Sequence, residues 1–483
     1  MMDLLPFEFA RKFSVLMDVD SNSLYLTQAT PMAAVLELQR ARNLNPSLHW
    51  LDADTFEARL QTMYAGRKDS SAVVMEDIKD NLDLQTVAGS LEEIGDLLDR
   101  DDDAPIIRLL NAILAEALNE KASDIHIEPY QHDARVRFRL DGVLRTVLTP
   151  ANHITPLLIS RIKVMAKLDI SEKRLPQDGR MSVRLGGRSI DLRVSTMPST
   201  YGERVVMRLL DKSATKLSVE DLGMTEEQRS RLHNLITRPH GMVVVTGPTG
   251  SGKTTTLYAA LQQMDRRERN IMTVEDPVEF DLPGISQTQI NLRAGMSFAR
   301  GLRAILRQDP DVILIGEIRD GETAEIAVQA SLTGHLLLST LHTNTAAGAV
   351  TRLQDLGIDN FLLASTLRGV LAQRLVRKLC DHCKQPYEAD KALRKQSPVP
   401  KGAIVYRHQG CEHCNWTGYQ GRRALFELVE IDEPLQKLIH DGAGEGELEA
   451  AIRKSVPGIL DEGYRLVMEG VTSVEEVLRV TTA

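Results

Sequence analysis

The sequence predicts an α/β protein in which a P-loop core follows an α+β domain. The residues from Gly247 to Thr254 match the phosphate-binding pattern G-x-x-x-x-G-K-[ST] at every fixed position. From Gly241 onward, short apolar runs alternate with helical patterns, which is typical of a parallel sheet flanked by helices. Between residues 105 and 212, apolar and polar residues instead alternate one by one, which predicts antiparallel strands.

The length of the chain predicts several domains, because 483 residues are too many for one core of about 100–200 residues. An acidic run at residues 99–103 (DRDDD) indicates a solvated connection rather than a packed element. We expect a small N-terminal domain over residues 1–67, a linker over 68–104, an α+β domain over 105–212, the P-loop core over 213–375, a four-cysteine subdomain over 376–420 and a C-terminal helical subdomain over 421–483.

Composition and charge narrow the class of protein. Hydrophobic residues make up 42% of the chain and charged residues 26%, as in soluble globular proteins. The net charge of −9 argues against a general nucleic-acid binder, which usually has a basic face. The first residues do not follow the pattern of a secretory signal, and no apolar run approaches the roughly 20 residues of a membrane helix. We expect a cytoplasmic protein that reaches a membrane only through a partner.

The α+β domain begins with a helical pattern of apolar residues after residue 104. In the run Ala134–Leu140, Val136, Phe138 and Leu140 alternate with three arginines, which predicts a strand with one face on a core. Two further alternating runs flank residues 186–187, a pair of glycines, and this arrangement predicts a hairpin.

The P-loop motif predicts a site for ATP and Mg²⁺. Its backbone N–H groups would surround phosphate oxygens, Lys253 would reach the β- and γ-phosphates, and the hydroxyl of Thr254 would bind Mg²⁺. A strand over residues 242–246 and a helix over 254–263 give the loop the expected setting, with the helix N-terminus toward the anion. The predicted nucleotide-binding residues are Gly247, Pro248, Thr249, Gly250, Ser251, Gly252, Lys253, Thr254 and Thr255.

Acidic residues follow two other predicted strands. Glu317 comes two positions after the end of the apolar run Val312–Ile315, at the strand end where ligands bind in open α/β sheets. Gly316 occupies the position where P-loop proteins usually carry Asp, so the role of holding Mg²⁺ or polarising water shifts to Glu317. The alternative is that Glu317 only caps the next helix.

The second acidic group consists of Glu275, Asp276 and Glu279. Clustered carboxylates repel one another unless a cation or a proton lies among them. Near a P-loop, Mg²⁺ and the attacking water are the natural occupants, and either Glu279 or Glu275 would orient that water. The alternative is a solvated acidic turn.

Histidines and arginines provide further candidates. His335 and His342 bracket the predicted strand Leu336–Leu341, where they would either sense the γ-phosphate or serve a structural role. Arg300, Arg303 and Arg307 share one face of a predicted helix, which is either a solvated face or a source of charge for a neighbouring nucleotide. The two readings stand about equal for each group.

The four cysteines predict a structural zinc site. Cys380, Cys383, Cys411 and Cys414 form two C-x-x-C pairs, a spacing that suits tetrahedral Zn²⁺ with thiolate ligands. Free thiols or a redox pair are the alternatives. His382 and His413 lie within the pairs and are possible substitute ligands or neighbours of the metal.

These motifs together resemble a known family, the secretion ATPases of type II secretion and type IV pilus assembly. The resemblance spans roughly residues 100–483, and within the family it is strongest to the type II secretion branch. It rests on residues 122–129 (ASDIHIEP), 175–210 (beginning LPQDGR), the P-loop, 273–280 (TVEDPVEF), 302–320 (LRAILRQDPDVILIGEIRD), 333–344 (TGHLLLSTLHTN), the four cysteines and 418–427.

The resemblance implies a RecA-like core, a PAS-like α+β domain and a homo-hexameric ring. It implies that Arg193 and Arg208 reach the nucleotide from the α+β domain, and that Arg303, Arg307 and Arg422 are further functional arginines. Arg193 lies on the strand face opposite its apolar neighbours, which agrees with a projecting side chain. The implied activity is ATP hydrolysis by a protein-secreting translocase.

The resemblance also implies partners at the inner membrane. Residues 1–70 would dock on the cytoplasmic domain of the L component of type II secretion, and the inner-membrane F component would be a second partner. The protein would then lie peripherally on the cytoplasmic face of the inner membrane and bind no nucleic acid. Three alternatives remain open: a pilus-extension ATPase, a RecA-like nucleic-acid motor, and a nucleotide-binding scaffold without turnover.

Overall fold

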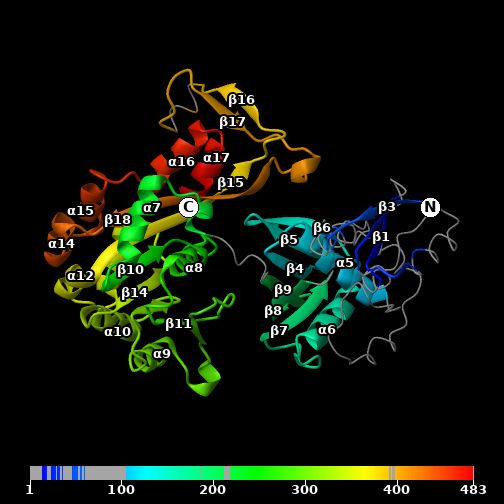
Figure 1. The fold of residues 1–483 in the computed structure, drawn as a ribbon, viewed down its shortest axis with the longest axis horizontal. Coiled ribbons are helices and arrows are strands. Elements are labelled where there is room, and N and C mark those ends of the chain that lie inside the picture. The colour runs from blue at the N-terminus through cyan, green and yellow to red at the C-terminus, as the bar shows by residue number, and fades with distance from the viewer. Residues whose placement is uncertain are drawn as a thin grey trace. The chain divides into compact units, whose positions relative to one another are not determined.

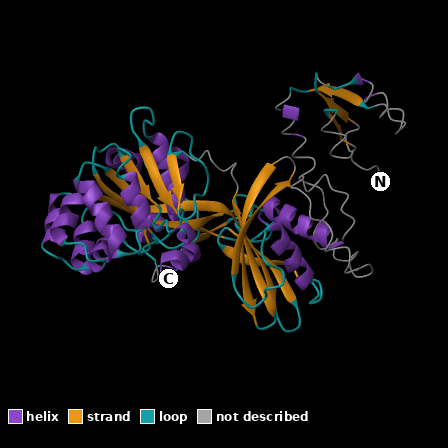
Figure 2. Cartoon of the chain, turned by 90° about the horizontal axis from the view of Figure 1, so that it is seen from below, coloured by secondary structure: helices purple, strands orange, loops and turns teal. Residues whose placement is uncertain are grey.

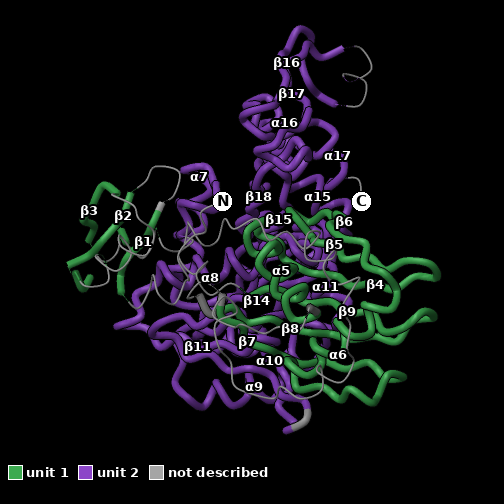
Figure 3. Tube along the Cα trace, turned by 90° about the vertical axis from the view of Figure 1, so that its right-hand side faces the viewer, with its two compact units in different colours: residues 1–213 green, residues 214–483 purple. Residues whose placement is uncertain are grey.

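The computed structural model divides the chain into two compact units, residues 1–213 and 214–483 (Figure 3). The structure describes residues 13–18, 23–28, 30–32, 35, 46–52, 55–56, 59, 105–185, 188–210, 218–390, 393 and 397–481. The expected linker over residues 68–104 therefore lies entirely outside the described residues. No helix among the described residues is long and apolar enough to cross a membrane.

The N-terminal part of the first unit contains a small three-stranded sheet. The strands are β1 (Val15–Asp18), β2 (Ser23–Leu26) and β3 (Ser47–Trp50). The first pair is antiparallel and the second pair is parallel. Val15, Leu16, Leu24 and Phe56 are buried together, so this segment has an apolar core of its own.

The described residues from 105 to 210 form an antiparallel sheet with two helices, α5 (Pro105–Asn119) and α6 (Thr155–Met165), on one face (Figure 2). The strand order is β6-β5-β4-β9-β8-β7. The strands are β4 (Asp124–Pro129), β5 (Ala134–Leu140), β6 (Val143–Leu148), β7 (Gln177–Leu185), β8 (Arg188–Ser199) and β9 (Gly202–Leu210).

Side-chain alternation explains the two faces of this sheet. Val136 and Phe138 are completely buried, and together with Val194 they face the helices. The expected hairpin is confirmed, because β7 and β8 pair antiparallel with Leu185 opposite Arg188. The two glycines between them lie outside the described residues.

The second unit is built on a seven-stranded sheet with the order β12-β11-β13-β14-β10-β15-β18 (Figure 1). Every pairing in this sheet is parallel except the last, between β15 and β18. The strands are β10 (Gly241–Thr246), β11 (Ile271–Glu275), β12 (Ser286–Gln289), β13 (Val312–Ile315), β14 (Leu336–Leu341), β15 (Leu367–Leu379) and β18 (Tyr419–Glu430). The predicted mixed α/β fold with a mainly parallel sheet is confirmed.

Helices cover both faces of this sheet, and each face has its own apolar cluster. One face is covered by η3 (Val219–Leu222), α7 (Glu226–Ile236) and α8 (Lys253–Gln263). The other is covered by α9 (Phe298–Ile305), α10 (Gly321–Leu332), α11 (Ala346–Asp355), α12 (Asn360–Thr366), α14 (Glu433–His440) and α15 (Glu445–Ile452). A short 3-10 turn, η4 (Leu292–Ala294), precedes α9.

Polar residues at the expected positions begin several of these helices. Thr225 caps α7 in a capping box with Gln228, Asp320 caps α10, and Thr345 caps α11. These caps supply acceptors for backbone N–H groups that no helical carbonyl can reach. They fix where these helices begin, and for α10 and α11 this point lies shortly after the ends of β13 and β14.

The C-terminal part differs from the expected domain boundaries. The expected boundary at residue 375 falls inside β15, and the first residues of the expected helical subdomain form β18 at the edge of the main sheet. Between these strands lie β16 (Gln385–Glu388), β17 (Ile404–Arg407) and η5 (Glu412–Cys414). The helices α16 (Ile459–Met468) and α17 (Val474–Thr481) pack against β15, β17 and β18.

Candidate functional site

The P-loop connects the end of β10 to the start of α8, as the sequence predicts. Gly247 has φ of 149° and Gly252 has φ of 87°, conformations that side chains with a Cβ rarely adopt. A Cβ on Gly247 would lie 2.4 Å from the carbonyl oxygen of Gln373. The loop therefore needs glycine at this position both for its backbone turn and for its close approach to β15.

Lys253 is buried at the first turn of α8 and its ammonium group folds over the loop. The Nζ atom donates to the carbonyl oxygens of Gly247 at 2.8 Å and Pro248 at 3.1 Å. Burial lowers the pKa of Lys253 to about 8, and the charge on Glu317 opposes this effect. Among the described residues, the buried hydroxyl of Ser251 has no hydrogen-bond partner. The P-loop and the Ser251 hydroxyl thus fit a phosphate ligand.

Glu317 lies at the carboxyl end of β13 with only 12% of its side chain exposed. Its Oε1 is 2.5 Å from Nη2 of Arg319, and its Oε2 is 3.4 Å from Nε2 of His342. Asp320, rather than Glu317, caps α10 by accepting from the N–H of Thr323 at 2.8 Å. The capping alternative for Glu317 is therefore wrong, and the carboxylate faces the edge that carries Lys253.

The two candidate histidines lie at opposite ends of β14. His342 follows the strand, next to Glu317, and burial followed by the nearby charge of Lys253 lowers its pKa. His335 precedes the strand, where its carbonyl oxygen accepts from the N–H of Gly241 at the start of β10. Since β10 and β14 run parallel, His335 is about 20 Å from the P-loop edge. The prediction that His335 senses phosphate is wrong, because its side chain belongs to the other edge of the sheet.

The three acids at and after the end of β11 have different surroundings. Glu275 is 3% exposed, and its carboxylate accepts from Thr273 Oγ1 at 2.6 Å, Gln287 Nε2 at 3.2 Å and the hydroxyl of Tyr258. Both carboxylate oxygens of Glu275 thus accept hydrogen bonds from other side chains of the protein. This arrangement does not support the prediction that Glu275 binds Mg²⁺ or orients water. Asp276 is exposed and Glu279 is half-buried.

The structure places the candidate arginines on several elements. In the second unit, Arg303 on α9 pairs with Glu322 at 2.7 Å, Arg307 donates to the carbonyl oxygen of Arg303, and Arg422 lies on β18. In the first unit, Arg193 and Arg208 are exposed and lie opposite each other on β8 and β9. Arg208 Nε donates to Asp124 at 3.0 Å.

Sequence reasoning missed several residues at the P-loop edge. Arg319 pairs with Glu317, and the charge of Arg374 on β15 acts on Lys253. Gln373 accepts from Thr256 on α8 at 2.8 Å. Arg319 could have been found from the sequence, because it lies two residues after Glu317 in the run 317–320 (EIRD). No motif around residues 373 and 374 indicates a role, and only the order of the strands brings them to the P-loop.

The four cysteine sulfurs form one cluster, in which all lie within 4.8 Å of one another. Three of the Sγ–Sγ distances are 3.8 Å. Tetrahedral zinc with bonds of about 2.3 Å separates its sulfurs by about 3.8 Å, whereas a disulfide needs about 2.05 Å. All four cysteines are free, so the arrangement fits a metal and excludes a disulfide in this conformation.

Backbone donors support a thiolate at Cys414, whereas burial raises the pKa of Cys380 and of Cys383. The N–H groups of Cys411 and Gly418 point at Cys414 Sγ from 3.2 and 3.1 Å. Burial opposes ionisation of this thiol, yet these bonds lower the pKa of Cys414 to about 7. His382 and His413 stack on each other with ring centroids 4.0 Å apart and are not members of the four-sulfur cluster.

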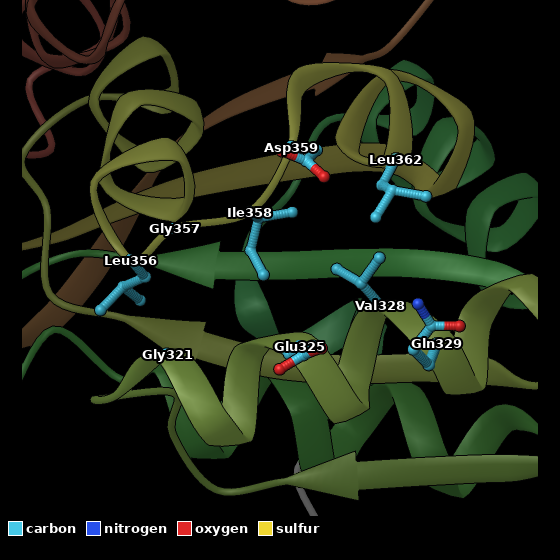
Figure 4. Close-up of a pocket in the computed structure, with 9 residues that line it drawn as sticks. All are labelled: Gly321, Glu325, Val328, Gln329, Leu356, Gly357, Ile358, Asp359 and Leu362. Carbon is cyan, nitrogen blue, oxygen red and sulfur yellow. The ribbon is translucent and has the colours of Figure 1, made fainter.

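A separate pocket of about 190 Å³ lies beside the first turns of α10 (Figure 4). None of the predicted site residues lines it. The lining residues are Gly321, Glu325, Val328, Gln329, Leu356, Gly357, Ile358, Asp359 and Leu362.

The lowered pKa of Lys253 predicts pH-dependent nucleotide binding. The protonated amine binds a phosphate anion, and the free site loses this proton as the pH rises through about 8. Affinity should be full near pH 7 and about tenfold weaker near pH 9, because one pKa unit corresponds to a factor of ten. Titration with a fluorescent ATP analogue at several pH values measures this.

The matched control for the pH titration is Lys253→Arg, since a guanidinium keeps its charge over the whole range. Whatever affinity this variant retains should vary little between pH 7 and pH 9. Equal affinities of the native chain at the two pH values would contradict the assignment of Lys253.

Comparison with known proteins extends these observations over the whole chain. Residues 99–479 match the family model described as type II/IV secretion system protein, and residues 4–64 match the model of a domain of GSPII protein E. The type II secretion system ATPase E of Vibrio cholerae serotype O1 is 56% identical over 484 residues, covering 99% of this chain and 96% of the relative. The type II secretion system protein E of Pseudomonas aeruginosa is 54% identical over 481 residues, with the same shares covered.

Solved structures share the fold. The pilus retraction motor PilT with bound ADP is 26% identical with a TM-score of 0.52, and the match covers 77% of this chain and 96% of PilT. The ATPase DotB of Legionella pneumophila is 20% identical with a TM-score of 0.59, covering 82% of this chain and 98% of DotB, a likeness of fold alone.

Proposed function

The chain belongs to the family of type II/IV secretion system proteins, and from this premise we propose that it is the ATP-hydrolysing motor subunit of a type II secretion system. Its work is to convert ATP hydrolysis into domain motion that drives pseudopilus assembly and the export of folded proteins across the outer membrane. The observation that carries the proposal is the convergence of Lys253, Glu317 and His342 at one edge of the parallel sheet.

In this proposal the chain's own residues position the triphosphate and the attacking water. The P-loop amides and Lys253 hold the phosphates, and Thr254 would hold Mg²⁺, which neutralises phosphate charge when bound. Glu317, paired with Arg319 and 3.4 Å from His342 Nε2, polarises water or would hold Mg²⁺, and Glu279 orients the attacking water. His342 with its lowered pKa is largely neutral at pH 7 and can follow the state of the γ-phosphate.

Assembly into a ring completes the site in this account. We propose a homo-hexamer in which Arg193 and Arg208 of the PAS-like domain reach the nucleotide, with Arg303, Arg307 and Arg422 as further charged contacts. Arginines supplied across a joint stabilise the charge of the transition state and couple hydrolysis to movement. The exposure of Arg193 and its position opposite Arg208 support this role.

We propose that two partner proteins hold the motor at the inner membrane. Residues 1–70 dock on the cytoplasmic domain of the L component, a proposal supported by the match of residues 4–64 to a domain of GSPII protein E. The inner-membrane F component receives the motion, and the protein lies on the cytoplasmic face of the inner membrane without entering it. Zinc at the four cysteines stabilises the segment between β15 and β18.

The ATPase rate measured against assembly state tests the proposal. We expect low turnover in the isolated monomer and at least about tenfold higher turnover in the assembled ring with the L-component cytoplasmic domain, because residues from a neighbour complete the site. Stimulation by the corresponding pilus-assembly partner instead would favour the pilus-extension ATPase. Stimulation only by DNA or RNA would overturn the proposal in favour of a nucleic-acid motor.

A further inference from the structure

Tyr258 on α8 is a buried group that the proposed chemistry does not use. It is 1% exposed and lies on the helix that Lys253 begins. Its hydroxyl donates to Glu275 and accepts from the N–H of Glu279 at 3.4 Å and from Gln287 Nε2 at 3.3 Å. One donor and two acceptor sites are all that a phenol offers, so the hydroxyl is fully used.

These bonds converge on residues 276–281, which we call the acid loop because it carries Asp276, Glu279 and Asp281. Gln287 on β12 also binds the loop. Its Nε2 donates to the carbonyl oxygen of Phe280 at 3.2 Å, and its Oε1 accepts from the N–H of Leu282 at 2.6 Å. The loop backbone is thus held at Glu279, at Phe280 and just past its end.

Ring packing also connects Tyr258 to the acid loop. The rings of Tyr258 and Phe280 meet edge to face with centroids 4.7 Å apart. Burial, followed by the charge of Glu275, raises the pKa of Tyr258 well above its ordinary value, so its hydroxyl remains a donor at any working pH. Tyr258 is the α8 residue whose hydroxyl links the P-loop helix to the backbone of Glu279.

We infer that Tyr258 is a positioning residue that fixes the acid loop, and with it Glu279, relative to the P-loop, and that Glu275 and Gln287 are the fixed points of this linkage. The inference rests on the proposed function, since Glu279 needs a positioned phosphate to act upon. In this arrangement Glu275 is a buried anchor for the tyrosine hydroxyl, and the work of orienting water falls to Glu279. A small displacement of a group that orients water lowers the rate without weakening ground-state binding.

The test is the steady-state kinetics of Tyr258→Phe in the full chain, assembled with the stimulating partner. We expect kcat to fall about tenfold while KM and the Kd of a fluorescent ATP analogue stay within about twofold. In a Glu279→Gln background, Tyr258→Phe should lower kcat by less than about twofold, because the two changes act on the same step. A purely structural tyrosine would instead give independent effects that multiply.

Tyr419→Phe is the matched control. Tyr419 is also buried, and its hydroxyl lies 2.8 Å from Ser473 Oγ; it begins β18, at the opposite edge of the sheet from β11 and β12, which flank the acid loop. This control should leave kcat unchanged. Should Tyr258→Phe fail to fold, Gln287→Ala at a half-buried position removes the other hold on the loop and should give the same fall in kcat.

Two results would overturn the inference and leave the proposed function standing: a native kcat in Tyr258→Phe, or the full tenfold loss repeated in the Glu279→Gln background. Failure of the proposed function looks different. In that case the native chain itself shows no turnover in the assembled state, whatever residue stands at position 258.

Discussion

Replacement of Lys253 by Ala should lower kcat for ATP hydrolysis at least about hundredfold, and the fold should persist. The ammonium group is the charge that the loop places against the phosphates, and removing one such group from a preorganised site costs about a factor of 10²–10³. In the free protein its bonds go to the carbonyl oxygens of Gly247 and Pro248, so few structural contacts are lost. Phosphate release by the assembled protein measures the effect, and circular dichroism checks the fold.

Lys437→Ala is the matched control for this change, because Lys437 is exposed on α14 and contacts no part of the P-loop. Its turnover should equal that of the native chain. Equal and near-zero turnover in the native chain and in Lys253→Ala, with the membrane partner present, would favour the non-hydrolysing scaffold. Substantial turnover in Lys253→Ala would place hydrolysis at another site.

Loss of one cysteine should have the largest effect on stability. Cys383→Ala leaves three sulfurs and should lower the zinc content from about one ion per chain to near zero. Structural zinc sites contribute on the order of 10 kcal/mol to the folding of the segment they join. We expect residues between β15 and β18 to become open to protease and the Tm to fall, as measured by metal analysis, limited proteolysis and calorimetry.

His382→Ala controls for local disturbance, since His382 lies inside the first C-x-x-C pair and outside the four-sulfur cluster. It should keep its zinc and most of its protease resistance. A native chain purified without chelator that holds no zinc would contradict the metal assignment, as would a Cys383→Ala variant that keeps the full metal content.

The parts of the site that local sequence determines were predictable. The P-loop follows from glycines and a lysine within one short segment, and Glu317 from its place after an uninterrupted apolar run. The four-cysteine cluster was predictable because its two C-x-x-C pairs carry their spacing in the chain itself.

Residues placed by strand order were harder to predict. His335 and His342 look equivalent along the chain, and only the direction of β14 separates them. A stricter use of the predicted parallel sheet would have separated them, since only carboxyl ends of parallel strands share the P-loop edge. Glu275 was predicted to bind Mg²⁺ or orient water because its partner Tyr258 lies on the preceding helix, which the sequence could not place against it.

The strands of the fold likewise divide into those that local sequence predicts and those that only long-range pairing reveals. Apolar runs predicted β10, β13 and β14, because strands buried on both faces are continuously hydrophobic. The edge strand β18 was assigned to a helical subdomain, since its charged first half (YQGRR) hides the apolar second half that pairs with β15. Only the antiparallel pairing with a strand about fifty residues earlier reveals it, and such pairing leaves little local pattern.

The most direct test of the account is whether the loop after Thr246 holds a triphosphate. Titration of the native chain with fluorescent ATP and Mg²⁺, as monomer and as assembled ring, measures this occupancy. We expect saturable, magnesium-dependent binding of one nucleotide per chain that is strongly weakened in Lys253→Ala. Absence of binding in both assembly states would contradict it.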